Sequence, residues 1–325
     1  MVPVASAPRV LIAGAGPAGL AAASMLRESG AIVTVLERAV SGALDDASRA
    51  GLVVNRSGWN VLRRVGGGSL LEDTRTAISA SEHLMSRRAI VESLAAHAEA
   101  AGVTIRRGVD IGAVGNAADG VSVALHDAAR GADEVLRADW FIDASGGHTA
   151  LSELPQFERV PTAGPMRLLP TERTFLGVKA QAAPGRGLGW QAADGAFAIN
   201  NPAEGVAVAY RGGDALPARG TLDDAADELM RSLDLDPSTR IGRPFVFTAR
   251  QSLAAHAADG RVLLAGDSVG TVMPATQMGT TLALLDAERA ARTILQSHGA
   301  DSTVAAAAVD AYDATTVLMH RMQLR

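Results

Sequence analysis

The alternation of apolar and polar residues is most regular at the start of the chain. Residues 9–13 (RVLIA) form a short apolar run with β-branched side chains, and a helical pattern from Ala18 to Glu28 follows a glycine-rich turn. A second apolar run, 32–36, comes after Gly30. Short apolar runs of this kind are typical of buried strands, and the helical spacing between them predicts a strand–turn–helix–strand unit.

The turn of this unit carries glycines at the G-x-G-x-x-G spacing, namely Gly14, Gly16 and Gly19. Gly14 permits the tight turn, Gly16 lets a pyrophosphate approach the backbone, and Gly19 lets helix and strand pack closely. The start of the helix offers free N–H groups and a positive dipole end to phosphates. Glu37, which ends the second strand, can accept hydrogen bonds from a ribose diol. Together these features predict a dinucleotide site.

The pattern changes between residues 154 and 250. Apolar runs become short, and prolines and glycines become frequent between them, which predicts antiparallel strands. After residue 250 the α/β pattern returns with RVLLA at 261–265, so the nucleotide domain is expected to be interrupted in sequence and completed near the C-terminus. The expected helices are 59–65, 90–101, 221–233, 278–297 and 304–322, and the expected strands of the interruption are 175–180, 195–200, 206–211 and 245–251.

Most aromatic residues lie in this middle region, although Phe, Trp and Tyr make up only 3% of the chain. Two compatible interpretations are open: the aromatic side chains line a mostly apolar pocket, or they form the core of a small sheet. The residues are Phe157, Phe175, Trp190, Phe197, Tyr210, Phe245 and Phe247.

Composition and charge exclude several classes of function. The net charge is −5 and the isoelectric point is near 5.8, which argues against a general nucleic-acid surface. The absence of Cys excludes disulfides and thiolate catalysis, and the seven His residues show no ligand spacing, so no metal site is expected. No leader pattern and no apolar run of membrane-spanning length is visible, so a soluble cytoplasmic protein is expected.

Three separated stretches together carry a family resemblance. They are AGAGPAG…VTVLER near the start, DASGG at 143–147 after an apolar strand, and RVLLAGDSVGTVMPATQMGTTLALLDAERAA at 261–291. A weaker fourth match is Arg87-x-x-Ile90-x-x-x-Leu94. The chain resembles the FAD-dependent aromatic hydroxylases and epoxidases of the p-hydroxybenzoate hydroxylase fold.

The resemblance implies an α/β fold with two parts. A Rossmann-like FAD/NAD(P)-binding domain, three-layered around a parallel sheet, carries an inserted substrate domain built on a mixed or antiparallel β-sheet. The implied FAD-binding domain is discontinuous and covers 1–72, 87–153 and 250–325. The implied substrate-binding domain covers 73–86 and 154–249.

The resemblance also implies a role for each matching residue. The glycine turn would hold the FAD pyrophosphate, Glu37 the adenosine ribose, and Asp267 the ribityl or pyrophosphate part. The N-terminus of the helix that begins near Gly279 would stabilise negative charge on the flavin ring. The implied cofactor-binding residues are Gly14, Gly16, Pro17, Ala18, Gly19, Glu37, Arg38, Arg49, Arg87, Gly266, Asp267, Pro274, Gly279 and Thr280.

The third stretch departs from the family's usual GDAAH-x-x-PP-x-GGQG-x-N string. Gly270 stands at the usual His, Met273 at the first of the paired prolines, and Thr281 at the usual Asn. The common D-G motif, which the aromatic hydroxylases tie to NADPH capture, is D-A-S-G here. The electron source is therefore expected to be NAD(P)H or a separate flavin reductase.

The function that the resemblance implies is an FAD-dependent monooxygenase of secondary-metabolite biosynthesis. It would insert one oxygen from O2, through a flavin C4a-hydroperoxide, into a hydrophobic or aromatic molecule or an alkene. His83, just before Arg87, is the candidate base for a phenol, and a plain surface or core histidine is the competing interpretation. The expected substrate-pocket residues are Met166, Leu168, Trp190, Phe197, Phe247 and Gln277.

Two alternatives of other kinds stay open. The first is a non-hydroxylating FAD protein of the same fold, a reductase or a cyclase. The second is a degenerate accessory flavoprotein that has lost its cofactor, which the intact glycine turn and Asp267 disfavour.

Overall fold

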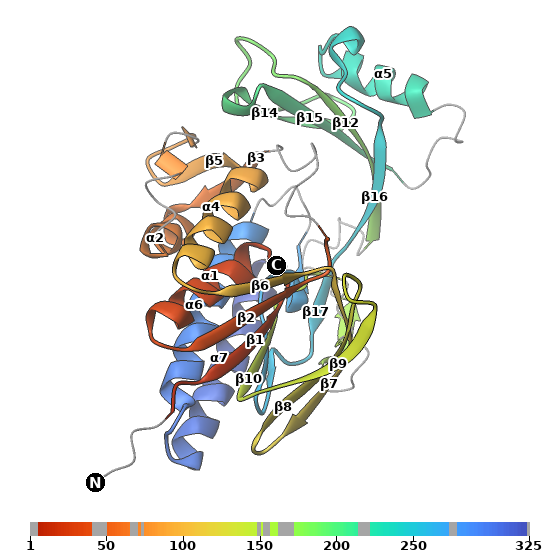
Figure 1. Cartoon of the computed structure of the whole chain (residues 1–325). Helices are drawn as coiled ribbons and strands as arrows, with labels where there is room; N and C mark the ends of the chain where they lie inside the picture. Colours follow the sequence, from red (N-terminus) through yellow and green to blue (C-terminus); the bar gives the residue numbers. More distant parts are fainter. Residues whose placement is uncertain are drawn as a thin grey trace.

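The chain folds into a large α/β part and a smaller sheet at one end of it (Figure 1). In this computed structural model the described residues are 6–40, 51–65, 71–72, 75–147, 151, 157–161, 172–213, 222–272 and 278–323.

The α/β part is built on a six-stranded sheet with the order β18-β19-β10-β1-β2-β6. All neighbouring strands are parallel except the edge pair β18–β19. The inner strands are short apolar runs buried on both faces, as expected for a covered parallel sheet. The strands are β1 (Arg9–Ala13), β2 (Ile32–Glu37), β6 (Thr104–Arg107), β10 (Trp140–Asp143), β18 (Ala258–Asp259) and β19 (Val262–Leu264).

Different layers cover the two faces of this sheet (Figure 1). Helices α1 (Pro17–Glu28), α4 (Arg87–Ala100), α6 (Gly279–Ser297) and α7 (Ser302–Gln323) lie on one face. An antiparallel sheet of β7 (Val109–Ala117), β8 (Gly120–Asp127) and β9 (Ala132–Ala138) covers the other. The predicted three-layer α/β fold around a parallel sheet is therefore confirmed.

Helix α1 packs against the sheet through small residues. Ala21, Ala22 and Ala23 are fully buried, and α1 contacts both α4 and α6. Gly19 has no room for a side chain, because an added Cβ would lie 2.0 Å from the carbonyl oxygen of Gly14 and 3.3 Å from Ile12 Cγ2. The turn and the helix are thus held in close contact, as the glycine spacing predicts.

The smaller part is a five-stranded antiparallel sheet with the order β13-β14-β15-β12-β16, and its two faces differ in chemistry. Leu176, Val178 and their neighbours on one face pack against helix α5 (Leu222–Ser232) in a separate core. The other face carries the aromatic side chains described below. The strands are β12 (Glu172–Gln181), β13 (Gly189–Gln191), β14 (Phe197–Asn201), β15 (Val206–Gly213) and β16 (Phe245–Arg250).

Two small sheets connect these parts. The first contains β3 (Gly51–Asn55), β4 (Thr76–Ala77) and β5 (Glu82–Ser86), with helix α2 (Arg56–Arg64) after β3. The second contains β11 (Arg159–Pro161), β17 (Ser252–Ala254) and β20 (Gly270–Thr271). Short 3-10 turns are η4 (Pro202–Glu204), η6 (Pro237–Thr239) and η7 (Gly266–Ser268).

One side chain joins the two parts directly. The Ser86 hydroxyl donates to Glu204 Oε1 at 2.7 Å. Ser86 Oγ also caps α4 by accepting from the backbone N–H of Ala89 at 2.9 Å. The expected helices are all present with small shifts at their ends, whereas β9 was not predicted. The proposed domain boundaries stay a prediction.

We predict that Gly19→Ala destabilises the fold. The added methyl group overlaps the Gly14 carbonyl, and overpacking of this kind costs about 1–3 kcal/mol of the free energy of unfolding. Chemical denaturation of the cofactor-free protein measures the loss. The matched control is Gly16→Ala, where an added Cβ has no neighbour within 4 Å, and equal stability losses in the two variants would contradict the prediction.

Candidate functional site

A cleft of about 570 Å³ opens where the parallel strands end. Because the carboxyl ends of β1, β2, β10 and β19 meet at one edge of the sheet, the loops that follow them line a common site. The start of α6 lines it from the helical layer, and Ile199 and Tyr210 line it from the five-stranded sheet. The cleft therefore lies between the two parts of the molecule.

The glycine turn is shaped to admit a ligand. Gly14 has a φ of +94°, and its N–H donates to the Leu36 carbonyl at 2.8 Å, which fixes the turn between β1 and β2. Gly16 precedes α1 and has open space where a side chain would be. No side chain caps the start of α1 and no acidic residue lies in its first turn, whereas Asn55 caps α2 and Ser86 caps α4. The first N–H groups of α1 suit a phosphate.

Glu37 is held in place at one end of the cleft. Its Oε2 accepts from the N–H of Ala15 at 2.7 Å, and its Oε1 accepts from the N–H of Ala39 at 2.8 Å. Each carboxylate oxygen has further acceptor capacity, so Glu37 suits a ribose diol without moving.

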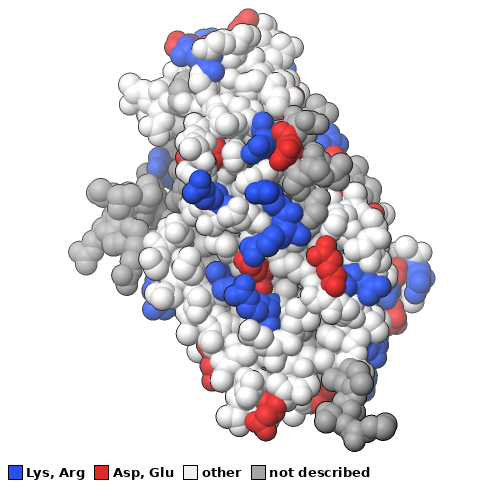
Figure 2. Space-filling model, turned by 90° about the vertical axis from the view of Figure 1, so that its left-hand side faces the viewer, with Lys and Arg blue, Asp and Glu red and all other residues white. Residues whose placement is uncertain are grey.

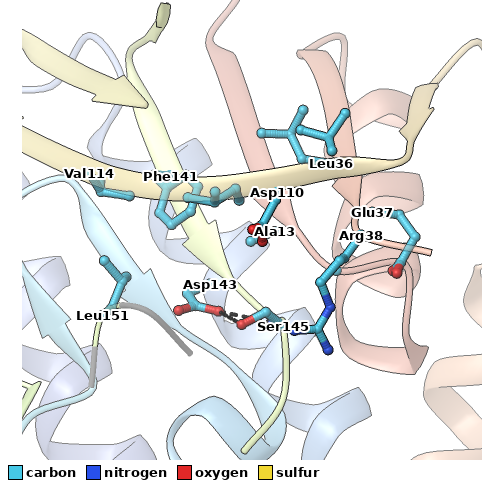
Figure 3. A pocket seen from close by; sticks show the side chains of 13 residues that line it. Ala13, Leu36, Glu37, Arg38, Asp110, Val114, Phe141, Asp143, Ser145 and Leu151 are labelled. Atoms are coloured by element: carbon cyan, nitrogen blue, oxygen red, sulfur yellow. Dashed lines mark hydrogen bonds between the residues drawn. The ribbon is translucent and has the colours of Figure 1, made fainter. Parts of the chain in front are cut away.

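A smaller cavity of about 230 Å³ continues beyond Glu37 (Figure 3). Leu36 and Arg38 line it together with Asp110 on β7 and Phe141 on β10. In Figure 3 the Arg38 side chain extends toward Ser145, and the other side of the cavity is mostly apolar. This cavity suits the adenine end of a dinucleotide. The sequence analysis did not identify Asp110, which reaches the site only through the β7 layer.

The loops after β10 and β19 are bonded to each other. Asp143 is buried, and its Oδ1 accepts from the Ser145 hydroxyl at 2.6 Å and the Ser268 hydroxyl at 3.1 Å. The Ser268 hydroxyl oxygen also accepts from the N–H of Gly146 at 3.1 Å. The D-A-S-G segment and the G-D-S segment thus form one rigid wall of the cleft.

The opposite end of the cleft is formed by the start of α6. Gly279 and Thr280 line it, and Asp267 lies close by, since a Cβ added to Gly279 would be 3.8 Å from Asp267 Oδ1. This helix, like α1, has no side-chain cap and no acidic residue in its first turn. Its positive dipole end therefore faces the cleft and favours negative charge there.

The structure gathers most of the predicted cofactor-binding residues in this one cleft. Gly19 lies behind the turn, in the contact between α1 and β1, and Arg49 and Pro274 lie outside the described residues. Sequence reasoning missed Gly51, Leu52, Ser145 and Tyr210 as residues of the cleft. Two of them had a signal in the sequence, Ser145 in the D-A-S-G motif and Tyr210 among the clustered aromatic residues. The predicted residues that line the cleft are Gly14, Gly16, Pro17, Ala18, Glu37, Arg38, Arg87, Gly266, Asp267, Gly279 and Thr280.

His83, the predicted base, lies elsewhere. It is on β5, with its ring 5.3 Å from Trp59 and its Nε2 3.4 Å from Arg75 Nη1. Burial, and secondly the Arg75 guanidinium, lower the pKa of His83. Among the described residues that line the cleft His83 does not appear, so its catalytic role stays a prediction without structural support.

The predicted substrate residues are only partly described. Phe197 and Phe247 belong to the aromatic face of the five-stranded sheet, and Trp190 lies on β13. Met166, Leu168 and Gln277 lie outside the described residues.

Three features of the described residues concern metals, membranes and surface charge. Within the described ranges, no group of three or more His, Asp or Glu residues is placed to hold a metal ion. None of the described helices has the length and apolar character needed to cross a bilayer. On the helical face seen in Figure 2, basic side chains gather at the centre with acidic side chains beside several of them. Arg64 of α2 forms an ion pair with Glu288 of α6 at 2.6 Å.

The residues of the cleft suit FAD. The cavity beyond Glu37 adjoins the open space at Gly16, and the start of α6 lines the same cleft. The model of the FAD binding domain family matches residues 8–92 and 81–316. The chain belongs to this family. The family assignment confirms FAD as the cofactor and a flavin-dependent oxidoreductase, with NAD(P)H as the electron source typical of the family.

Solved structures show the same fold at low sequence identity. The p-nitrophenol 4-monooxygenase of Pseudomonas putida DLL-E4 superposes with a TM-score of 0.81 at 16% identity, over 99% of this chain and 88% of that one. An aklavinone-11 hydroxylase, solved with FAD and aklavinone, gives 0.75 at 20% identity, over 89% and 63%. The Diels-Alderase of the pyrroindomycin pathway gives 0.71 at 20% identity, over 98% and 73%. These matches confirm the predicted p-hydroxybenzoate hydroxylase fold.

We predict that Gly16→Ala weakens FAD binding without unfolding the protein. The added methyl group points into space that is empty of protein atoms and that the pyrophosphate is expected to occupy. The dissociation constant of FAD should rise at least about tenfold, which corresponds to ~1.4 kcal/mol. Fluorescence titration of the cofactor-free protein with FAD measures it. Unchanged affinity would place the pyrophosphate elsewhere.

Proposed function

We propose that this protein is an FAD-dependent monooxygenase that transfers one oxygen atom from O2 to a hydrophobic aromatic or alkene-containing small molecule. The observation that carries the proposal is the aromatic face of the five-stranded sheet. Through Tyr210 this face reaches the same cleft whose other wall is the start of α6. A substrate between them would lie next to the reactive end of the cofactor.

The aromatic face is a continuous set of packed rings. Phe175 stacks on Phe247 at 5.3 Å between ring centroids, and Tyr210 stacks on Phe197 at 5.1 Å. Phe245 lies edge-on to Tyr210 at 6.3 Å. These residues fall on one face because antiparallel pairing sets Phe175 beside Phe247 and Phe197 beside Tyr210. Such a surface favours flat apolar molecules and excludes water.

Gly177 makes this arrangement possible. It stands opposite Phe245 in the sheet, and a Cβ there would lie 2.3 Å from the Phe245 ring. The ring of Phe245 therefore lies flat across β12 and extends the apolar surface toward Tyr210.

Tyr210 is the polar group on this surface. Burial raises the pKa of its hydroxyl to about 12, so the group stays neutral and keeps its proton at physiological pH. A neutral phenol can donate a hydrogen bond to a carbonyl or phenol oxygen of a substrate. We assign Tyr210 the role of orienting the substrate, which places its reacting carbon toward the flavin end of the cleft.

The other residues of the site bind and shield. When FAD is bound, it supplies two-electron redox chemistry and activation of O2, and the protein provides orientation and a dry environment. The α1 N-terminus and Gly16 hold the phosphates, and Glu37 holds the ribose. The N-terminus of α6 stabilises negative charge at the ring end of the cleft.

The names of the similar structures support an oxygenase and a biosynthetic setting. They include hydroxylases of aklavinone and anhydrotetracycline, and also a Diels-Alderase. We therefore propose a small-molecule substrate of secondary metabolism, and electrons from NAD(P)H directly or through a partner flavin reductase.

We predict that the purified protein is yellow and consumes O2 only when its flavin is reduced. Anaerobic addition of NADPH should bleach the flavin absorbance if NADPH binds directly, whereas bleaching only after a flavin reductase is added identifies a two-component system. Admission of ¹⁸O₂ in the presence of a panel of phenols and polycyclic quinones should put one labelled atom into the product.

The competing functions give different results in this experiment. A cyclase or other non-oxygenating flavoprotein would convert an acceptor without taking up label. Reoxidation of the flavin with no labelled product from any compound of the panel would contradict the monooxygenase assignment.

We predict that Tyr210→Phe lowers kcat/KM about tenfold, the loss of one hydrogen bond worth ~1.4 kcal/mol. FAD affinity should not change, because the proposal gives the Tyr210 hydroxyl a role in orienting the substrate and none in holding the cofactor. Phe197→Leu, which alters the stacking on Tyr210 but keeps its hydroxyl, is the control and should have a smaller effect. Equal activity of Tyr210→Phe and the parent protein would exclude this role.

A further inference from the structure

A buried polar cluster lies behind the loop that lines the cleft at Gly266 and Asp267. Its centre is Asp286 on α6, whose side chain is fully buried. Asp286 Oδ2 accepts from the backbone N–H of Gly266 at 2.9 Å and faces His320 Nε2 at 2.7 Å. Its Oδ1 accepts from the Arg289 guanidinium. A carboxylate in this position is retained only if such partners compensate its burial.

The bond to Gly266 connects this cluster to the cofactor site. Gly266 has a φ of +66° and lies between Ala18 on α1 and Ala283 on α6, where an added Cβ would have 3.3–3.4 Å contacts. It precedes Asp267, which lines the cleft. The carboxylate of Asp286 therefore fixes the loop that presents Asp267.

The partner of Asp286 comes from the C-terminal helix. His320 is on α7 and only 1% exposed, and its Nδ1 has no hydrogen-bond partner within the described part of the chain. The ring thus uses a single donor, Nε2, to hold the carboxylate. On the same helix the Tyr312 hydroxyl donates to the carbonyl of Leu264, at the end of β19, just before the loop.

His320 also fills the space beside Gly270. A Cβ on Gly270 would lie 3.1 Å from His320 Nδ1 and 3.0 Å from the Ser252 carbonyl oxygen. Gly270 stands where the resembling hydroxylases usually have a loop histidine. In this chain Gly270 leaves the loop position without a side chain, and the His320 imidazole of α7 lies against it.

We propose that His320 is a positioning residue for the flavin site: by holding Asp286 it sets the place of the Gly266–Asp267 loop, so that helix α7 takes part in cofactor binding. The inference concerns FAD binding, which the family assignment establishes, and does not depend on the oxygenation reaction. A failure to find a hydroxylated product would leave it unaffected.

The test compares three variants in full-length protein by FAD titration, by the visible spectrum of the bound flavin and by thermal unfolding without cofactor. His320→Leu removes the donor and should raise the dissociation constant of FAD at least about tenfold and shift the flavin absorbance bands. His320→Gln keeps one donor and should restore most of the affinity. Val317→Ala removes buried apolar volume about one turn earlier on the same helix and is the control for loss of packing.

The outcomes separate positioning from general stability. The proposal is supported if His320→Leu loses FAD affinity while Val317→Ala, with a similar fall in melting temperature, keeps it. It is overturned if both variants weaken FAD equally, or if His320→Leu binds FAD with the parent affinity and spectrum. If His320→Leu fails to fold, the test uses Gly270→Ala, whose added methyl group contacts the His320 ring. An unchanged flavin spectrum and FAD affinity in Gly270→Ala would overturn the proposal.

Discussion

The wall of the cleft that the glycine turn forms depends on one close contact, between the turn after strand β1 and the start of helix α1. The Gly14 carbonyl and Gly19 approach so closely that even a methyl group at residue 19 would overlap. This contact sets the angle at which α1 leaves the sheet and aims its uncapped N–H groups along the strand ends. The parallel register then brings Ala13, Leu36 and Asp143 to the same level, so the loops after β1, β2 and β10 meet there.

The sequence could predict those features that depend on local chemistry. The glycine turn needs φ values and close approaches that glycine permits, and Glu37 ends the strand that follows α1, so both could be located from spacing. The pattern of apolar residues also located four of the five strands of the smaller sheet, whereas β13 was not predicted. Strand β9 was missed because its sequence, ADEVLRA, contains three charged residues and is largely exposed. Its place in the structure comes from antiparallel pairing with β8.

Residues that reach the site across the fold could not be placed there from spacing. Asp110 lines the smaller cavity because β7 crosses the parallel sheet, and Tyr210 lines the cleft because β15 pairs with β14 in one particular register. His83 was predicted from its nearness to Arg87 in sequence. Its ring lies 5.3 Å from that of Trp59, and it is not among the described residues that line the cleft, so its catalytic role stays a prediction.

The Asp286 cluster shows how the end of the chain takes part in a site defined by its beginning. A buried carboxylate that accepts one backbone N–H, one imidazole and one guanidinium has little freedom to move, so the loop bonded to it is fixed as well. The same loop is bonded on its other side to Asp143 through Ser268. Asp267 is thus supported from both the sheet and the helical layer. Such double support gives the precision that a cofactor site needs, because hydrogen bonds made by the loop alone would leave Asp267 free to shift with it.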